Sequence, residues 1–126
     1  MLKHYDLDIC SMSIYENYVI NQIKEGIHLE TDHVESLEKL INKHLNYQPF
    51  VYISYRTNSY SFDPLVHVHI NKIKNLKTFI IITDDKTKLD IVAFEKRFSK
   101  KKLIVTESLE DAIAWVEKFF NSTQIA

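Results

Sequence analysis

Three short segments of the chain are apolar on both of their alternating faces. They are PFVYISY at 49–55, TFIIIT at 78–83 and KLIVT at 102–106, and they are rich in β-branched or aromatic residues. Strands without a polar alternation are typical of sheets that are covered on both sides. We therefore expect these segments to lie in the middle of a parallel or mixed sheet.

The segment 31–45, TDHVESLEKLINKHL, has the spacing of an amphipathic helix. Its apolar side chains recur three or four residues apart, at Val34, Leu37, Ile41 and Leu45. Asp32 and Glu35 are placed as an N-cap and its capping-box partner. We expect a helix that buries one face against the sheet.

A second helix is predicted at 86–98, KTKLDIVAFEKRF, where we expect Leu89, Val92 and Phe98 or their neighbours to be buried. It lies between two of the apolar strands. Such alternation of strands and helices is typical of a sheet whose strands are joined by right-handed crossovers.

The clearest helix follows at 108–120, SLEDAIAWVEKFF, with Ser108 as its N-cap and Asp111 as the reciprocating residue. Its apolar face is broad. That face comprises Leu109, Ala112, Ile113, Val116, Phe119 and Phe120. We expect it to belong to the core or to a dimer surface.

The N-terminal region predicts two antiparallel strands. Residues 4–14 alternate as one strand whose inward phase shifts near Cys10, which we interpret as a bulge. YVINQIK at 18–24 follows a tight turn at 16–17, so the two strands should form a hairpin. Gly26 ends the second strand.

The segment 55–70, YRTNSYSFDPLVHVHI, admits two structures. Asp63 and Pro64 fit the start of a helix, because Asp accepts a bond from the first amides and Pro has its φ preset. The following residues also alternate as in a strand. We favour a helix for residues 64–74, because parallel strands on either side need a crossover.

The same choice decides the chemistry of His67 and His69. On a helix, residues two apart point about 200° away from each other and cannot chelate one ion. On a strand they would share a face. Because no further ligand stands at a recognisable spacing, we expect no metal and no other cofactor.

Composition removes several classes of protein. The 126 residues suit one domain. Sixteen basic and seventeen acidic residues give a net charge of −1, so we expect no nucleic-acid partner. The single glycine, Gly26, is too few for a dinucleotide fingerprint, a phosphate loop or a nucleophile elbow. The charged N-terminus and the short longest apolar run predict no signal peptide and no membrane span, and the lone Cys10 favours the cytoplasm.

With this order of elements, the chain resembles a STAS domain over almost its whole length. The residues that carry the likeness are VYISYRTNSYSFDP at 51–64, NLKTFIIIT at 75–83, FEKRF at 94–98 and LEDAIAWVEKFF at 109–120. It is most similar to short stand-alone bacterial proteins of the sporulation-antagonist-like branch, which is related to CRAL-TRIO-type lipid-binding domains. The resemblance implies one α/β domain over residues 1–126, with a mixed sheet of about five strands and three to four helices.

Antagonists of this family carry an acceptor serine in a D-S-[ST]-G-like turn, whereas this chain reads NSYSFDP there. Ser59 and Ser61 lie close to the expected place and are candidates for phosphorylation. A phosphate is favoured at a helix N-terminus, but Asp63 already stands there and would repel it. We favour the interpretation that both serines bond loop backbone.

The segment after strand 49–55 also holds the candidates for ligand binding, because open α/β sheets bind ligands beyond strand ends. Arg56 would pair with an acidic group while aromatic residues cover an apolar body. The candidates are Arg56, Asn58, Tyr60, Phe62 and His67. The alternative, which we favour slightly, is an ordered loop whose Arg and Tyr bond backbone carbonyls.

Other charged groups have simpler interpretations. Asp84 and Asp85 could hold Mg²⁺ or act as acid and base, but capping of the next helix is favoured. Arg97 and Lys100–Lys102 form a basic cluster that we interpret as a solvated turn.

We therefore expect a non-enzymatic binding or regulatory module for a small apolar-acidic, lipid-like ligand or a protein partner, compatible with a homodimer. The alternatives are a phosphoregulated antagonist-like switch, or a small enzyme that uses Asp84, Asp85, Arg56 or His67.

Overall fold

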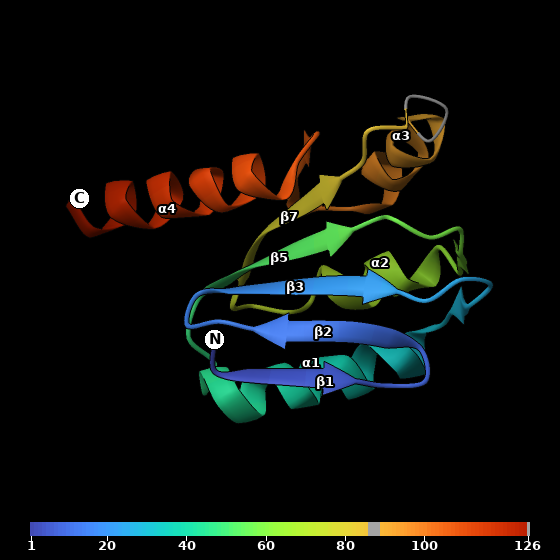
Figure 1. Cartoon of the computed structure of the whole chain (residues 1–126), viewed down its shortest axis with the longest axis horizontal. Coiled ribbons are helices and arrows are strands. Elements are labelled where there is room, and N and C mark those ends of the chain that lie inside the picture. Colours follow the sequence, from blue (N-terminus) through green and yellow to red (C-terminus); the bar gives the residue numbers. More distant parts are fainter. Residues whose placement is uncertain (86–88, 126) are drawn as a thin grey trace.

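The computed structural model describes residues 1–85 and 89–125. Its main element is a six-stranded mixed sheet with strand order β1-β2-β3-β5-β7-β8, and helices pack on both faces (Figure 1). The strands of this sheet are β1 (Lys3–Asp6), β2 (Cys10–Ile14), β3 (Tyr18–Ile23), β5 (Phe50–Tyr55), β7 (Leu76–Ile82) and β8 (Lys102–Thr106). The helices are α1 (Thr31–Leu45), α2 (Leu65–Ile70), α3 (Leu89–Phe98) and α4 (Leu109–Ile125), and a small second sheet pairs β4 (His28–Leu29) with β6 (Ser61–Phe62).

The α/β class and the mixed sheet are confirmed. The first three strands are antiparallel neighbours, and β3, β5, β7 and β8 run parallel through the crossovers. The main sheet has one strand more than the predicted five because residues 4–14 form two strands. Within the described residues, no helix is long and apolar enough to cross a membrane.

The phase change at the N-terminus marks a reversal of the chain. The amide of Leu7 donates to the carbonyl of Cys10 at 2.8 Å, which closes a tight turn between β1 and β2. Tyr5 then pairs with Met12 across the hairpin. The predicted bulge was wrong because a tight turn also moves the inward phase by one residue.

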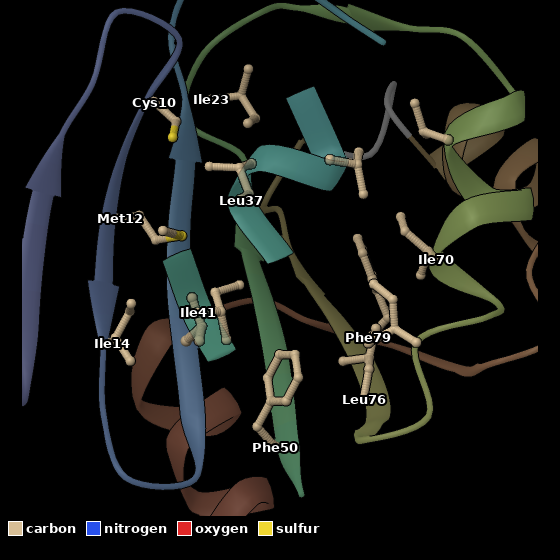
Figure 2. Packing of buried hydrophobic residues seen from close by; sticks show 14 of the residues in the cluster. Cys10, Met12, Ile14, Ile23, Leu37, Ile41, Phe50, Ile70, Leu76 and Phe79 are labelled. Atoms are coloured by element: carbon tan, nitrogen blue, oxygen red, sulfur yellow. The ribbon is translucent and has the colours of Figure 1, made fainter. Parts of the chain in front are cut away.

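The larger core lies between the sheet and helices α1 and α2 (Figure 2). Its buried side chains come from β2, β3, α1, β5, α2 and β7, and include Cys10, Met12, Ile14, Ile23, Leu37, Ile41, Phe50, Ile70, Leu76 and Phe79. Alternation along β5 and β7 divides their apolar residues between this core and the opposite face. This explains why both strands read as apolar on both alternations.

The smaller core lies under α4, where Val51, Ile53, Ile80 and Ile82 meet Ala112 and Val116. Helix α4 begins as predicted, since the Asp111 amide donates to Ser108 Oγ at 3.1 Å. Strand β8 is at the edge of the sheet and is only half-buried, so its predicted central place was wrong. Its apolar side chains pack against the two cores on opposite faces of the sheet, and this does not require a neighbouring strand on each side.

Helix α1 has the predicted bounds but a different cap. Glu30 is the N-cap, its side chain accepts from the backbone of His33, and the Glu30 amide donates to His33 Nδ1 at 2.9 Å. The predicted capping pair, Asp32 and Glu35, lies inside the first turns instead. A reciprocal cap can use His as well as Glu or Gln, which the usual pattern does not include.

The preferred helix in the segment 64–74 is confirmed over Leu65–Ile70. Asp63 Oδ1 accepts from the Leu65 amide at 2.9 Å, as expected of a residue at a helix start. The short strand β6 just before it was not predicted. It pairs with β4, and this pairing fixes the loop that leads into α2.

Helix α3 buries a different set of residues from the predicted one. Val92 and Glu95 are buried, whereas Leu89 and Phe98 are 44% and 37% exposed. The first predicted residues of this helix, 86–88, lie outside the described residues. Glu95 is therefore a charged residue inside the protein.

Candidate functional site

An arginine and a histidine side chain both bond one buried carboxylate. Arg56 Nη1 donates to Glu95 Oε1, and Arg56 Nη2 donates to Glu95 Oε2 at 2.9 Å. His67 Nε2 lies 3.0 Å from Glu95 Oε2. The side chains of Arg56, His67 and Glu95 are 9%, 3% and 1% exposed. We call these three residues the buried triad.

Three elements bring the buried triad together. Arg56 follows the end of β5, and its amide donates to the carbonyl of Ile82 on β7 at 3.1 Å. His67 lies on α2, and Glu95 lies on the inner face of α3. Because Arg56 Nε also donates to Ser54 Oγ at 3.1 Å, the guanidinium is bonded at all three nitrogens.

The electrostatics of the triad are balanced between Arg56 and Glu95. Burial alone would raise the pKa of Glu95, but hydrogen bonds from His67 and Arg56 outweigh it and hold this pKa below its usual value. Burial alone would lower the pKa of Arg56, but the bond to Glu95 raises it. Both groups are therefore charged near neutral pH, as a matched buried pair.

An apolar cavity of about 60 Å³ lies beside the triad, between the sheet and helices α1 and α2. Figure 2 shows part of its wall, formed by Leu37, Ile41, Phe50, Ile70, Leu76 and Phe79. Its polar lining residues are the triad together with Glu38, Tyr52, Ser54 and Tyr60. We call this space the inner cavity.

A second hollow, of about 110 Å³, lies beyond the triad and is lined by Asn58, Ser59, Thr83 and residues of α3. Arg56, Tyr60 and Phe62 line both spaces. The Tyr60 ring lies 5.9 Å from Arg56 Cζ, within range of a cation–π contact. These three residues therefore form a shared wall between the inner cavity and this outer hollow.

The five ligand candidates lie around these spaces. Arg56, Tyr60, Phe62 and His67 line the inner cavity, and the Phe62 ring meets the His67 ring edge-on at 5.6 Å. Asn58 lines the outer hollow, and its Nδ2 donates to the carbonyl of Ile23 at 3.0 Å. The expected bond from Arg56 to a backbone carbonyl was wrong, because its guanidinium bonds the side chains of Ser54 and Glu95. Ligand binding by the five candidates stays a prediction.

The two serines have different partners. The Ser59 amide donates to the Glu25 carboxylate at 2.8 Å, and Ser61 Oγ lies 2.8 Å from His28 Nδ1. Both residues are exposed. A phosphate on Ser59 would stand close to the charge of Glu25. Ser61 Oγ bonds a side chain rather than the expected loop backbone. Phosphorylation of either serine stays a prediction.

The remaining polar candidates have other surroundings. Asp84 and Asp85 line neither space, and the Asp85 amide donates to Thr83 Oγ1 at 3.2 Å. His69 points to α1, where its Nε2 lies 2.7 Å from Glu38 Oε2. Among the described residues, no group of three or more His, Cys, Asp or Glu side chains could hold a metal ion.

The basic cluster is partly committed to the protein's own backbone. Lys101 Nζ donates to the carbonyl of Ile73 at 2.7 Å, so it is not fully solvated. The Lys100 amide donates to Asn71 Oδ1, also at 2.7 Å. These bonds tie the turn before β8 to the end of α2.

Glu95 was missed by the sequence reasoning. It stands three residues after Val92 in the pattern of α3, on the face that the helix buries. A single charged residue at a core position of a helix is the signal that could have found it, because buried charges are rare unless they are paired. Its partners come from distant segments, so the pairing itself had no local signal.

No protein-family model matches this sequence, and no curated protein matches it significantly. Among solved structures, it is similar to an uncharacterised protein of the DUF3478 family from Shewanella loihica PV-4, described as having a SpoIIAA-like fold. The TM-score is 0.57 at 15% identity, over 89% of this chain and 97% of that chain. The chain therefore has a STAS-like fold, while the relation to CRAL-TRIO-type domains stays a prediction.

Proposed function

We propose that this protein is a non-enzymatic binding or regulatory module that takes a small, largely apolar ligand into the inner cavity. The observation that carries the proposal is an apolar cavity bordered on one side by the buried triad. Ligand sites are typically apolar spaces with a few convergent polar groups. The STAS-like fold is consistent with a regulatory role.

The size of the cavity limits the ligand. An apolar cavity of about 150 Å³ holds benzene. A space of about 60 Å³ therefore holds only a few carbon atoms. A larger lipid-like ligand would need to pass the shared wall at Tyr60 and Phe62 and occupy the outer hollow as well.

The pairing of Arg56 bears on the acidic part of the expected ligand. Its charge is already balanced by Glu95 through two hydrogen bonds. An acidic ligand would have to share the guanidinium with that carboxylate, which costs free energy by like-charge repulsion. The apolar part of the ligand is therefore better supported than the acidic part.

The first experiment is native mass spectrometry of gently purified protein, compared with the denatured sample. A mass excess that disappears on denaturation is the expected result. It is followed by titration with xenon, a small apolar probe of protein cavities, read from the methyl NMR signals of residues that line the inner cavity. The expected shifts are confined to Leu37, Val66 and Ile70 and their neighbours in the cavity wall.

A matched pair of variants on α2 provides the control. Val66→Phe fills the inner cavity and should abolish the xenon response, whereas Val68→Phe adds the same ring at an exposed position and should leave it unchanged. A native protein without excess mass, together with no localised methyl shifts, would contradict the proposal.

A second candidate function is binding of a protein partner through the outer face of α3. Its apolar residues Leu89, Ile91, Phe94 and Phe98 are between 37% and 46% exposed. Exposed apolar groups of this kind mark interaction surfaces when they are contiguous. Cross-linking in cells should capture a complex of the wild-type protein with its partner, and this complex should be lost when Phe94 and Phe98 are both replaced by Ser. The same cross-linked complexes for the variant and the wild type would count against this function.

The enzymatic alternative has less support. Asp84 and Asp85 line neither the inner cavity nor the outer hollow, and Arg56 is held by Glu95 and Ser54. A catalytic role would require these groups to meet a substrate in one cleft. The phosphoregulated alternative rests on Ser59 and Ser61, whose replacement by Ala should then abolish switching of a partner.

A further inference from the structure

One edge of the central sheet gathers lysines that are far apart in the sequence. Strands β3, β5 and β7 point the same way in Figure 1, and β8 pairs parallel to β7, so their first residues lie at this edge. The connections from α1 to β5, from α2 to β7 and from α3 to β8 meet there. The lysines in or next to these connections, which we call the basic edge, are Lys43, Lys72, Lys74, Lys77, Lys100 and Lys101.

Hydrogen bonds hold the three connections together. Asn71 Nδ2 donates to the carbonyl of Phe98 at 2.9 Å, and Asn71 Oδ1 accepts from the Lys100 amide. Asn75 Nδ2 donates to the carbonyl of Gln48 at 3.1 Å, which joins the connection after α1 to the connection after α2. The basic edge is therefore one surface, although three separate segments build it.

The surrounding sequence supplies almost no counter-charge. Between residues 39 and 83 the only acidic residue is Asp63, which stands before the start of α2, and residues 96–106 contain none. The acidic residues that give the chain its net charge of −1 lie mostly in other segments. A nearly neutral protein thus carries a locally positive surface.

Two lysines of the basic edge bond the protein itself. Lys101 Nζ donates to the carbonyl of Ile73, and Lys77 Nζ donates to the carbonyl of Lys74 at 3.3 Å. Burial and the nearby charge of Lys77 lower the pKa of Lys101. The other four lysines are exposed, and their side chains form no hydrogen bond or ion pair with any residue that the structure describes. Uncompensated charges of one sign attract a partner of the opposite sign.

Exposed apolar side chains lie beside these charges. Tyr47, in the connection from α1 to β5, is 71% exposed. Phe98 directly precedes the turn that carries two of the lysines, and its ring centroid lies 4.9 Å from that of Phe94. Ile91 stands three residues before Phe94 on the same side of α3, and all three side chains of α3 are at least 37% exposed. Lysines next to such side chains are typical of proteins that lie on a membrane surface.

We propose that the basic edge docks on a membrane surface that carries anionic lipid headgroups, with Tyr47, Phe94 and Phe98 inserted among the headgroups. The inference goes beyond the proposed function, because it needs neither the inner cavity nor a ligand inside it. Groups of about four to eight basic residues beside an amphipathic helix are the pattern that anionic lipids attract. Here the helix is α3, and the basic residues come from its C-terminal turn and from the two neighbouring connections.

A membrane suits this surface better than a nucleic acid or a protein does. Lysine is a point charge that fits a diffuse anionic surface, whereas recognition of nucleic acids favours the planar fork of arginine. Ile91 offers no ring on which a base could stack, but it can enter the headgroup region. A protein partner bound only through the apolar face of α3 would leave the lysines without counter-charges.

The test is co-sedimentation of the full chain with lipid vesicles. One set of vesicles is pure phosphatidylcholine, and the other contains about one third phosphatidylserine, which makes the surface negative. The protein should sediment only with the second set at about 0.1 M NaCl, and about 1 M NaCl should release it by screening the charges. The salt dependence is measured on the wild-type protein, so it does not depend on whether a variant folds.

Two matched double variants locate the contact. Lys72→Gln with Lys74→Gln removes two charges from the basic edge, and should weaken binding to the phosphatidylserine vesicles by at least about tenfold. Lys24→Gln with Lys118→Gln removes two exposed charges beyond the end of β3 and on α4, and should change the affinity by less than about twofold.

Tyr47→Ser tests the apolar part of the contact. The side chain is largely exposed, so this variant should unfold in urea like the wild type. It should bind the phosphatidylserine vesicles at least about threefold more weakly, because the ring no longer enters the headgroup region. Unchanged binding would overturn the insertion of Tyr47.

Several outcomes would overturn the inference as a whole. They are absence of binding to the phosphatidylserine vesicles, equal binding to both sets of vesicles, and equal loss of affinity in the two double variants. Tighter binding to an oligothymidine of about 20 nucleotides than to the vesicles would also overturn it and favour a nucleic acid. Val66→Phe, which fills the inner cavity, should bind the vesicles like the wild type, so failure of the proposed function and failure of this inference are distinguishable.

Discussion

The two faces of the central sheet bury side chains of different chemistry. Under α4, the buried side chains of the smaller core are apolar, as at Ile53, Ile80 and Val116. On the opposite face the core includes a charged pair, a buried histidine and a cavity. The comparison teaches that one core is built from apolar side chains, whereas the other also accommodates paired charges beside a cavity.

The largest effect is expected from Glu95→Gln, because it leaves the Arg56 charge buried without a counter-charge. Removing one partner of a buried ion pair costs about 3–5 kcal/mol. The free energy of unfolding, measured with urea, should fall by about this amount. Replacing both partners, as Arg56→Met with Glu95→Leu, should cost less than Glu95→Leu alone. A double variant as unstable as the single one would show that the charges are not coupled.

Truncations of apolar residues should differ between the two faces. Ile80→Ala under α4 and Ile70→Ala in the cavity wall each cost about 2–5 kcal/mol. We expect the larger loss for Ile80, because it is completely buried in the smaller core, whereas Ile70 already borders the inner cavity. Urea unfolding of both variants measures the difference, and a larger loss for Ile70 would contradict the division between the faces.

Acid should weaken the site face through Glu95. Although burial opposes it, hydrogen bonding to His67 and Arg56 keeps the pKa of Glu95 below its ordinary value. Its carboxylate therefore contributes stability that is present above that ordinary value, about 4.3, and is lost as the pH falls through the folded value. The wild-type protein should lose stability more steeply than Glu95→Gln as the pH falls below about 5. If the stability of the two proteins falls in parallel with pH, Glu95 does not cause the acid sensitivity.

The smallest effect is expected outside both cores, at Ser61. Its hydroxyl bonds to His28 on the surface, so Ser61→Ala should change the free energy of unfolding by no more than about 0.5 kcal/mol. The same urea measurement tests this expectation. A loss above about 1 kcal/mol would mean that the pairing of β4 with β6 depends on this hydroxyl.

Local signals predicted most of the fold. The spacing of α1, the Asp-Pro step before α2 and the serine before α4 lie within single segments, so the sequence alone reveals them. The reversal near Leu7 was misread, because a turn and a bulge change the alternation in the same way. The edge position of β8 depends on the order of strands, which no segment encodes locally.

The candidate site was predictable only in part. Arg56, Tyr60 and Phe62 could be chosen because they follow the end of a strand, and they do line the cavity. Glu95 could not be linked to them, because its partners are 39 and 28 residues away along the chain. The favourable energy of a buried ion pair appears only in the folded protein.

The same separation along the chain has a consequence for folding during synthesis. Arg56 and His67 leave the ribosome well before Glu95, which follows His67 by 28 residues. Until α3 emerges, neither side chain has its carboxylate, so burying them is unfavourable. The wall of the inner cavity can therefore close only after α3 has left the ribosome.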